Sequence, residues 1–143
     1  MATWRAFLME EAMEETRQGR CLCGAVSYRI EGDPGGVTYC HCSMCRRQTG
    51  HFYATINIKR EQLTIDGEAS LSWYASSNEA RRGFCARCGS ALFWKNTTSN
   101  DIAVLAGGLD KPTGLQGEAH IFVTDKGDYY EIDDDLPQHA VVQ

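Results

Sequence analysis

The chain has 143 residues and a formal net charge of −5, from 14 lysines and arginines against 19 aspartates and glutamates. Hydrophobic residues make up 43% of the chain and charged residues 23%. These proportions are typical of one globular domain and argue against intrinsic disorder for most of the chain. The acidic balance disfavours binding to nucleic acid or to an anionic membrane, because both usually require a basic excess.

The sequence also indicates where the protein resides. No apolar run approaches the ~20 residues needed to cross a bilayer. The first residues lack a long apolar core and turn acidic at Glu10 and Glu11, unlike a secretory signal. We therefore expect a cytoplasmic protein with no membrane partner, in which cysteines are normally reduced. Seven cysteines in such a chain favour metal binding over disulfides.

The predicted elements begin with an N-terminal extension over residues 1–17, in which residues 3–17 are expected to form a short amphipathic helix. A mostly-β domain is expected over residues 18–137, and residues 138–143 form a C-terminal tail. The predicted strands, in chain order, are 26–31, 52–58, 63–65, 71–74, 91–94, 102–105, 120–123 and 129–132. One or two helical turns are expected around Ser43–Gln48.

The seven cysteines fall into three clusters: Cys21-Leu22-Cys23, Cys40-His41-Cys42-Ser43-Met44-Cys45 and Cys85-Ala86-Arg87-Cys88-Gly89. In a C-x-C pair on an extended backbone, both side chains point the same way. In C-x-x-C the chain makes a tight turn that brings both sulfurs to one ion. A glycine after the second cysteine relieves a position that often needs positive φ.

Tetrahedral zinc divides these cysteines into four and three. Cys85 and Cys88 need two partners, and the C-x-C pair supplies them, which predicts a structural zinc held by Cys21, Cys23, Cys85 and Cys88. The remaining cysteines, Cys40, Cys42 and Cys45, form a compact set that we call the cysteine trio. Three ligands leave a coordination position open, as in catalytic zinc sites. The alternative is a single zinc with four thiolates, the other thiols being small buried hydrophobes.

Arginines lie close to both cysteine regions. Arg46 and Arg47 follow the trio directly, where a helix start and the guanidinium groups both favour the thiolate form. A second set beside Cys85 and Cys88 comprises Arg81, Arg82 and Arg87. These arginines either neutralise the metal centres or lie in solvent; as a group they can also attract a small anionic substrate.

His41 lies between two trio cysteines, so its side chain points to the opposite face if the segment is extended. It is either a fourth metal ligand or, in the favoured interpretation, a histidine hydrogen-bonded in a turn. Together with Asp134 and Asp135 it is a candidate for acid–base chemistry.

Four ordered motifs resemble the glutathione-dependent formaldehyde-activating family, which includes the centromere protein V-like domains. They are Gly19-Arg20-Cys21-Leu22-Cys23-Gly24-Ala25-Val26-Ser27-Tyr28, Cys40 through Gly50, Phe84 through Trp94, and His120-Ile121-Phe122-Val123 through Pro137. The resemblance covers residues 19–137. It implies a β-tent fold, a structural zinc on the four-cysteine set, and a more labile zinc on the trio, near which glutathione binds.

The resemblance further implies a carbon–sulfur lyase-type activity, the condensation of formaldehyde with glutathione to S-(hydroxymethyl)glutathione. Cys40, Cys42 and Cys45 would then hold the catalytic zinc, and Arg46 or Arg47 would contact the substrate carboxylates. The sequence leaves two alternatives open: a non-catalytic zinc module that binds protein or nucleic acid, and a thiol-rich redox or metal-buffering protein.

Overall fold

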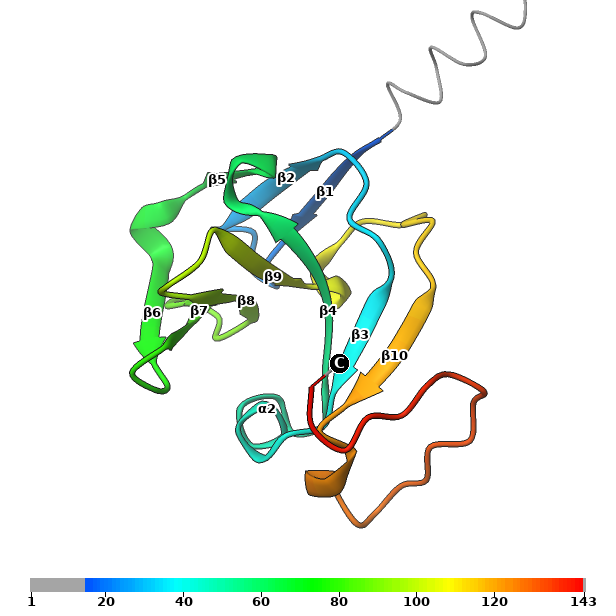
Figure 1. Cartoon of the computed structure of the whole chain (residues 1–143). Coiled ribbons are helices and arrows are strands. Elements are labelled where there is room, and N and C mark those ends of the chain that lie inside the picture. Colours follow the sequence, from blue (N-terminus) through cyan, green and yellow to red (C-terminus); the bar gives the residue numbers. More distant parts are fainter. Residues whose placement is uncertain (1–14, 143) are drawn as a thin grey trace, which may run out of the picture.

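Short strands build the fold in the computed structural model, which describes residues 15–142 (Figure 1). The strands are β1 (Thr16–Arg20), β2 (Ser27–Glu31), β3 (Val37–Cys40), β4 (Tyr53–Lys59), β5 (Leu63–Asp66), β6 (Leu71–Ala75), β7 (Ala80–Cys85), β8 (Ala91–Asn96), β9 (Asp101–Leu105) and β10 (Gly117–Ile121). The helices are α2 (Ser43–Thr49) and the single 3-10 turns η1 (Arg60–Gln62), η2 (Glu68–Ser70), η3 (Ala106–Gly108) and η4 (Val123–Asp125).

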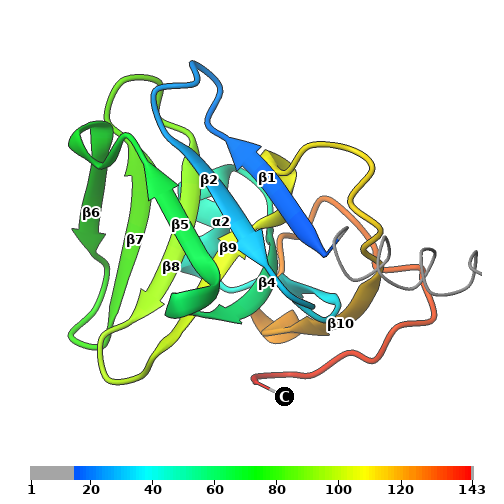
Figure 2. The same ribbon diagram turned by 90° about the horizontal axis from the view of Figure 1, so that it is seen from above.

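The strands form two sheets. The smaller sheet has the order β1-β2-β5, and Figure 2 shows these strands side by side as a separate layer. The larger sheet has the order β10-β3-β4-β9-β8-β7-β6. Its neighbours pair antiparallel, apart from β10, which pairs parallel with β3. Because β3 and β10 run in the same direction, their carboxyl ends reach the same edge of the sheet, near α2 (Figure 1).

The apolar core draws residues from both sheets. Tyr28 and Ile30 alternate with exposed positions on β2, as expected for a strand with one buried face. From the larger sheet, β4, β8 and β9 contribute Ile56, Ile58, Leu92, Phe93, Ile102 and Val104. Burying one such side chain contributes roughly 1.5–3 kcal/mol. The core therefore fixes the two sheets against each other and gives the cysteine turns a rigid base.

The mostly-β, β-tent class predicted from the sequence is confirmed. Five of the predicted strands coincide with β4, β5, β6, β8 and β9 to within two residues, and the predicted helical turns coincide with α2. The strand predicted at 26–31 corresponds to β2, and that at 120–123 overlaps the end of β10. The sequence pattern missed β1, β3 and β7.

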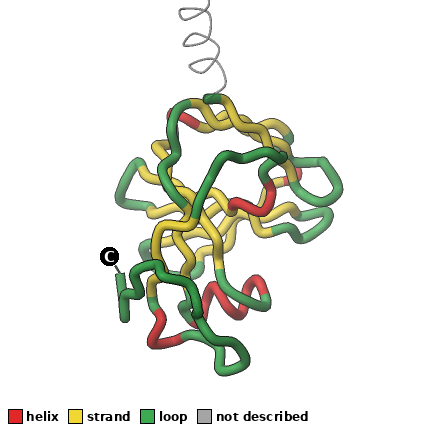
Figure 3. Tube along the Cα trace, turned by 90° about the vertical axis from the view of Figure 1, so that its right-hand side faces the viewer, coloured by secondary structure: helices red, strands yellow, loops and turns green. Residues whose placement is uncertain are grey.

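The strand predicted over 129–132 is wrong, because this segment is a loop (Figure 3). Two of its side chains are tyrosines whose hydroxyl groups bond to histidines, Tyr129 to His51 and Tyr130 to His41. Side-chain hydrogen bonds thus replace backbone pairing here. Most of the helix predicted over 3–17 lies outside the described residues, but Thr16 and Arg17 belong to β1, where they pair with β2.

Candidate metal centres

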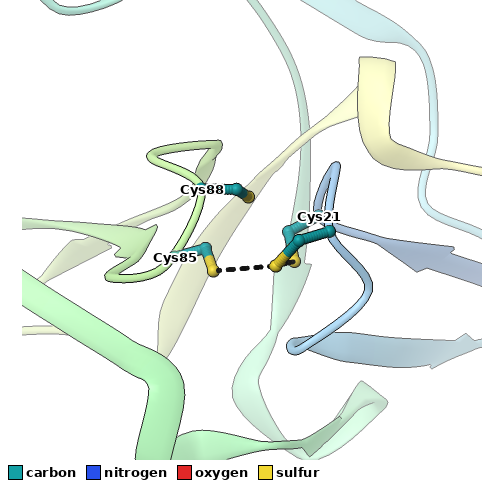
Figure 4. Close-up of side chains that lie close together, drawn as sticks. Cys21, Cys85 and Cys88 are labelled. Atoms are coloured by element: carbon teal, nitrogen blue, oxygen red, sulfur yellow. Dashed lines mark hydrogen bonds between the residues drawn. The ribbon is translucent and has the colours of Figure 1, made fainter.

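Four cysteines from two distant segments meet at one point. The sulfurs of Cys21, Cys23, Cys85 and Cys88 all lie within 4.8 Å of one another, and Figure 4 shows the labelled side chains converging. The sulfur–sulfur distance is 3.7 Å for Cys21 and Cys23 and 3.8 Å for Cys23 and Cys85. A tetrahedral site with metal–sulfur bonds of ~2.3 Å has sulfur–sulfur edges of about 3.8 Å. The four-cysteine set therefore fits a zinc-sized ion.

The Cys21–Cys23 pair reaches this point by a route that differs from the expected one. We predicted an extended C-x-C pair, but these residues occupy a turn after β1, in which Gly24 N–H donates to the Cys21 carbonyl. The Val26 N–H donates to the Cys21 sulfur at 3.3 Å. The segment forms a turn rather than an extended strand because the chain must reverse direction between β1 and β2, which pair antiparallel.

The Cys85–Cys88 pair has the geometry that its spacing predicts. Cys85 ends β7, and the following turn is closed by a hydrogen bond from Gly89 N–H to the Cys85 carbonyl. Gly89 has φ +81°, a left-handed conformation that side chains rarely adopt. The Arg87 N–H donates to the Cys85 sulfur at 3.4 Å. Such backbone donors favour the thiolate form that metal binding requires.

The cysteine trio forms the second cluster, at the end of β3 and the start of α2. Its three sulfurs also lie within 4.8 Å of one another, with 3.4 Å between the sulfurs of Cys40 and Cys45. Cys42 is the N-cap of α2, and its sulfur accepts a hydrogen bond from Cys45 N–H at 3.4 Å. Gly50 ends the helix in the left-handed conformation.

The donor chemistry of the trio also suits a metal ion. Hydrogen bonding from the Cys40 sulfur lowers the pKa of Cys42, whereas the same interaction raises the pKa of Cys40. Negative charge thus concentrates on one sulfur of a set that a dication would deprotonate fully. Both clusters can therefore bind metal ions, and thiolate ligands select soft or borderline ions such as zinc.

Of the four-cysteine set, Cys21 alone lines a neighbouring pocket, of about 610 Å³, whereas the trio borders open space with all of its members. The trio lines a cavity of about 430 Å³ into which all three cysteines face. The apolar part of the wall includes Met44, Trp94, Ala103, Ile121, Phe122 and Val142. The cavity combines apolar walls with a small set of polar groups, as is usual for small-molecule sites.

The arginine beside the trio is a different one from those that the sequence predicted. Arg82, assigned to the neighbourhood of Cys85 and Cys88, instead reaches the trio, with its Nη1 3.6 Å from the sulfur of Cys45. Strand alternation explains this: Arg81 on β7 is exposed, so the next side chain points to the buried face. Arg46 and Arg47 do not line the trio cavity; Arg47 lines an adjoining cavity of about 740 Å³ that Arg82 also borders.

A chain of hydrogen bonds runs behind the trio. His41 is 1% exposed; its Nδ1 bonds to the Tyr130 hydroxyl and its Nε2 lies 2.8 Å from Nδ1 of His120. The Nε2 of His120 lies 2.9 Å from a carboxylate oxygen of Asp134, and this bond lowers the pKa of Asp134. Burial lowers the pKa of His41 to about 4, so its imidazole is neutral near pH 7.

These linked hydrogen bonds show which of the candidate acid–base residues contact one another. Both ring nitrogens of His41 have hydrogen-bond partners, which matches the hydrogen-bonded interpretation rather than a role as fourth metal ligand. Both aspartates are exposed, but Asp134 bonds to His120 and so belongs to these linked hydrogen bonds, of which Asp135 is not a part. Sequence reasoning did not identify Tyr130 or His120 as partners of His41, because they come from segments 89 and 79 residues away.

The fold and its two sulfur clusters define a β-sheet protein with two candidate metal-binding cysteine sites. The sequence profile of the family described as "Glutathione-dependent formaldehyde-activating enzyme" matches residues 16–125. The match spans more than half of the chain, which therefore belongs to this family.

Two relatives and one solved structure extend the comparison. A Halomonas elongata protein, whose name provisionally assigns it to glutathione-dependent formaldehyde activation, is 28% identical over 81% of this chain and 80% of its own. An uncharacterized lyase of Schizosaccharomyces pombe is 26% identical over 80% of this chain and 83% of its own. A crystal structure of a Rhodobacter sphaeroides protein has a TM-score of 0.55 and 27% identity, and covers 66% of this chain and 88% of that one.

Among the residues that the structure describes, we find no helix that is both long and apolar enough to cross a membrane.

Proposed function

We propose that this chain is a zinc enzyme of the carbon–sulfur lyase type that joins a small thiol to a carbonyl compound. Family membership and the lyase-named relative support an enzyme of this kind. Glutathione and formaldehyde, giving S-(hydroxymethyl)glutathione, are the substrate pair that the family description favours. The activity would be that of a protein in the cytoplasm, with zinc at both cysteine clusters.

One observation carries the proposal: all three members of the three-sulfur cluster line one cavity, whereas the pocket of about 610 Å³ beside the four-cysteine set is lined by a single one of its members, Cys21. The four-cysteine set has a complete tetrahedral ligand set, as in structural zinc sites. The trio has three ligands and space beside them, as in catalytic sites. When bound at Cys40, Cys42 and Cys45, zinc supplies a Lewis acid that favours the ionised form of a thiol.

The protein residues around the trio provide the other requirements of a thiol–carbonyl reaction. The apolar walls exclude water from the reacting groups, which strengthens the electrostatic interactions between them. Arg47 lines the adjoining cavity, which supports a contact between its guanidinium group and a carboxylate of an extended thiol such as glutathione. We keep Arg46 as a second candidate for this contact, since it precedes Arg47 on α2.

The experiment is an exchange measurement by nuclear magnetic resonance. The exchange between glutathione, formaldehyde and their adduct in buffer gives the uncatalysed rate, and the zinc-loaded chain should accelerate formation and breakdown equally, since a catalyst leaves the equilibrium unchanged. Metal-free protein should lose the acceleration and regain it on adding zinc. Cys42→Ser should lose it while retaining the metal of the four-cysteine set. An exchange rate equal to that of the buffer would exclude this substrate pair.

A further inference from the structure

Arg82 is a buried cation whose hydrogen-bonding capacity is only partly used. It is 5% exposed, and its Nη1 makes two long contacts, 3.6 Å to the Cys45 sulfur and 3.4 Å to Oε1 of Gln48. Its Nε is buried without a partner among the described residues. A guanidinium group has five donors, and leaving buried donors unpaired is costly. The side chain is therefore prepared for an additional acceptor.

Tyr53 presents a second unused donor beside it. The residue is 2% exposed, and its hydroxyl is buried without a partner among the described residues. The Arg82 guanidinium carbon lies over the Tyr53 ring, 5.1 Å from its centroid, so the two side chains pack against each other. Burial raises the pKa of Tyr53 to about 12, so the hydroxyl keeps its proton near pH 7.

Both residues line the 430 Å³ cavity that the cysteine trio also lines. A molecule bound in this cavity would therefore contact the cysteine sulfurs and also the two hydrogen-bond donors, the Arg82 guanidinium group and the Tyr53 hydroxyl. Asp125 is the acidic side chain on the same cavity, but it is exposed, so water screens its charge. An arginine guanidinium keeps its positive charge in proteins even when it is buried.

We propose that Arg82 and Tyr53 bind a carboxylate of the thiol that enters the trio cavity, and thereby select carboxylate-bearing thiols over neutral ones. A guanidinium fork and a phenol hydroxyl together suit the two oxygens of a carboxylate. The inference rests on the proposed function in one respect, namely that the ligand is a thiol. It assigns a carboxylate contact inside the trio cavity to β7 and β4, in addition to the contact proposed for Arg47 on the adjoining cavity.

The test compares two thiols of similar size, mercaptoacetate and 2-mercaptoethanol, by titration calorimetry on the zinc-loaded full chain. The measured quantity is the ratio of their dissociation constants. In the parent, mercaptoacetate should bind at least about tenfold more tightly, as charge-assisted hydrogen bonds imply. Tyr53→Phe and Arg82→Lys should each bring this ratio toward one. A merely structural role, or simple neutralisation of the trio, would weaken both thiols equally and leave the ratio unchanged.

Matched controls come from exposed residues that line neither cavity, Arg81→Lys on β7 and Tyr129→Phe in the loop after β10, and these variants should keep the parental ratio. Circular dichroism and metal content verify that each variant is folded and loaded. Tyr53→Phe removes one oxygen and decides the question if Arg82→Lys fails to fold. A parental ratio in Tyr53→Phe overturns the inference while the proposed function stands. If the parent binds neither thiol, the proposed function fails and the inference with it.

Discussion

His41 and His120 share a buried hydrogen bond of 2.8 Å between Nε2 of the first and Nδ1 of the second. His41 lies between two trio cysteines, whereas His120 lies on β10, the parallel neighbour of β3. Tyr130 bonds to the other nitrogen of His41, and Asp134 to the other nitrogen of His120. The segment after β10 therefore positions the turn that carries the trio.

Tyr130→Phe should destabilise the protein by about 1–3 kcal/mol, because it leaves a buried ring nitrogen of His41 without a partner. Tyr129→Phe is the matched control. Its hydroxyl bonds to the exposed His51, so the expected loss is about 0.5 kcal/mol or less. Urea unfolding of the zinc-loaded proteins measures both. Equal midpoints for the two variants would show that the His41 contact contributes nothing to stability.

Cys88→Ala should remove the metal of the four-cysteine set and unfold much of the chain. The four sulfurs join the turn after β1 to the turn after β7, so losing the ion releases both. Metal binding to structural thiolates contributes folding free energy directly. We expect the melting temperature to fall by about 10 °C or more. Cys42→Ala is the comparison, since it should keep this ion and the fold; a Cys88→Ala variant that melts like the parent would refute a structural role.

Mild chelation should remove the trio metal before the other one. Three protein ligands hold an ion less firmly than four, and the trio opens into a cavity through which a chelator can enter. Metal analysis during dialysis against a weak chelator should show about one ion lost while the circular dichroism spectrum is unchanged. Simultaneous loss of both ions with unfolding would contradict the assignment of two different roles.

Arg47→Ala should weaken glutathione binding up to about fivefold, the range expected for an exposed ion pair. The parental affinity should fall as salt is added, and the variant's affinity should depend less on salt. Arg46→Ala is measured in parallel, because either arginine is a candidate for the carboxylate contact. Arg29→Ala, on the smaller sheet, serves as the control. If calorimetry gives the same affinity for all four proteins, neither α2 arginine takes part in recognition.

The sequence by itself determined the candidate ligand sets and most of the strands. Cysteines two to five residues apart lie on one turn, so Cys40, Cys42 and Cys45 converge by local geometry alone. The glycine after Cys88 adopts the positive φ that its position predicted. Alternating apolar residues identified β2 because one face of that strand is buried in the core.

Only the tertiary structure decided which distant side chains complete the site. Arg82 reaches Cys45 across 37 residues, and Tyr130 reaches His41 across 89. These contacts depend on the order of strands in the larger sheet and on the path of the loop after β10. Local patterns carry no information on that order, since it follows from the packing of both sheets around one core. For the same reason, the sequence pattern around Tyr129 and Tyr130 is typical of a strand, whereas in the fold their hydroxyl groups form hydrogen bonds with His51 and His41.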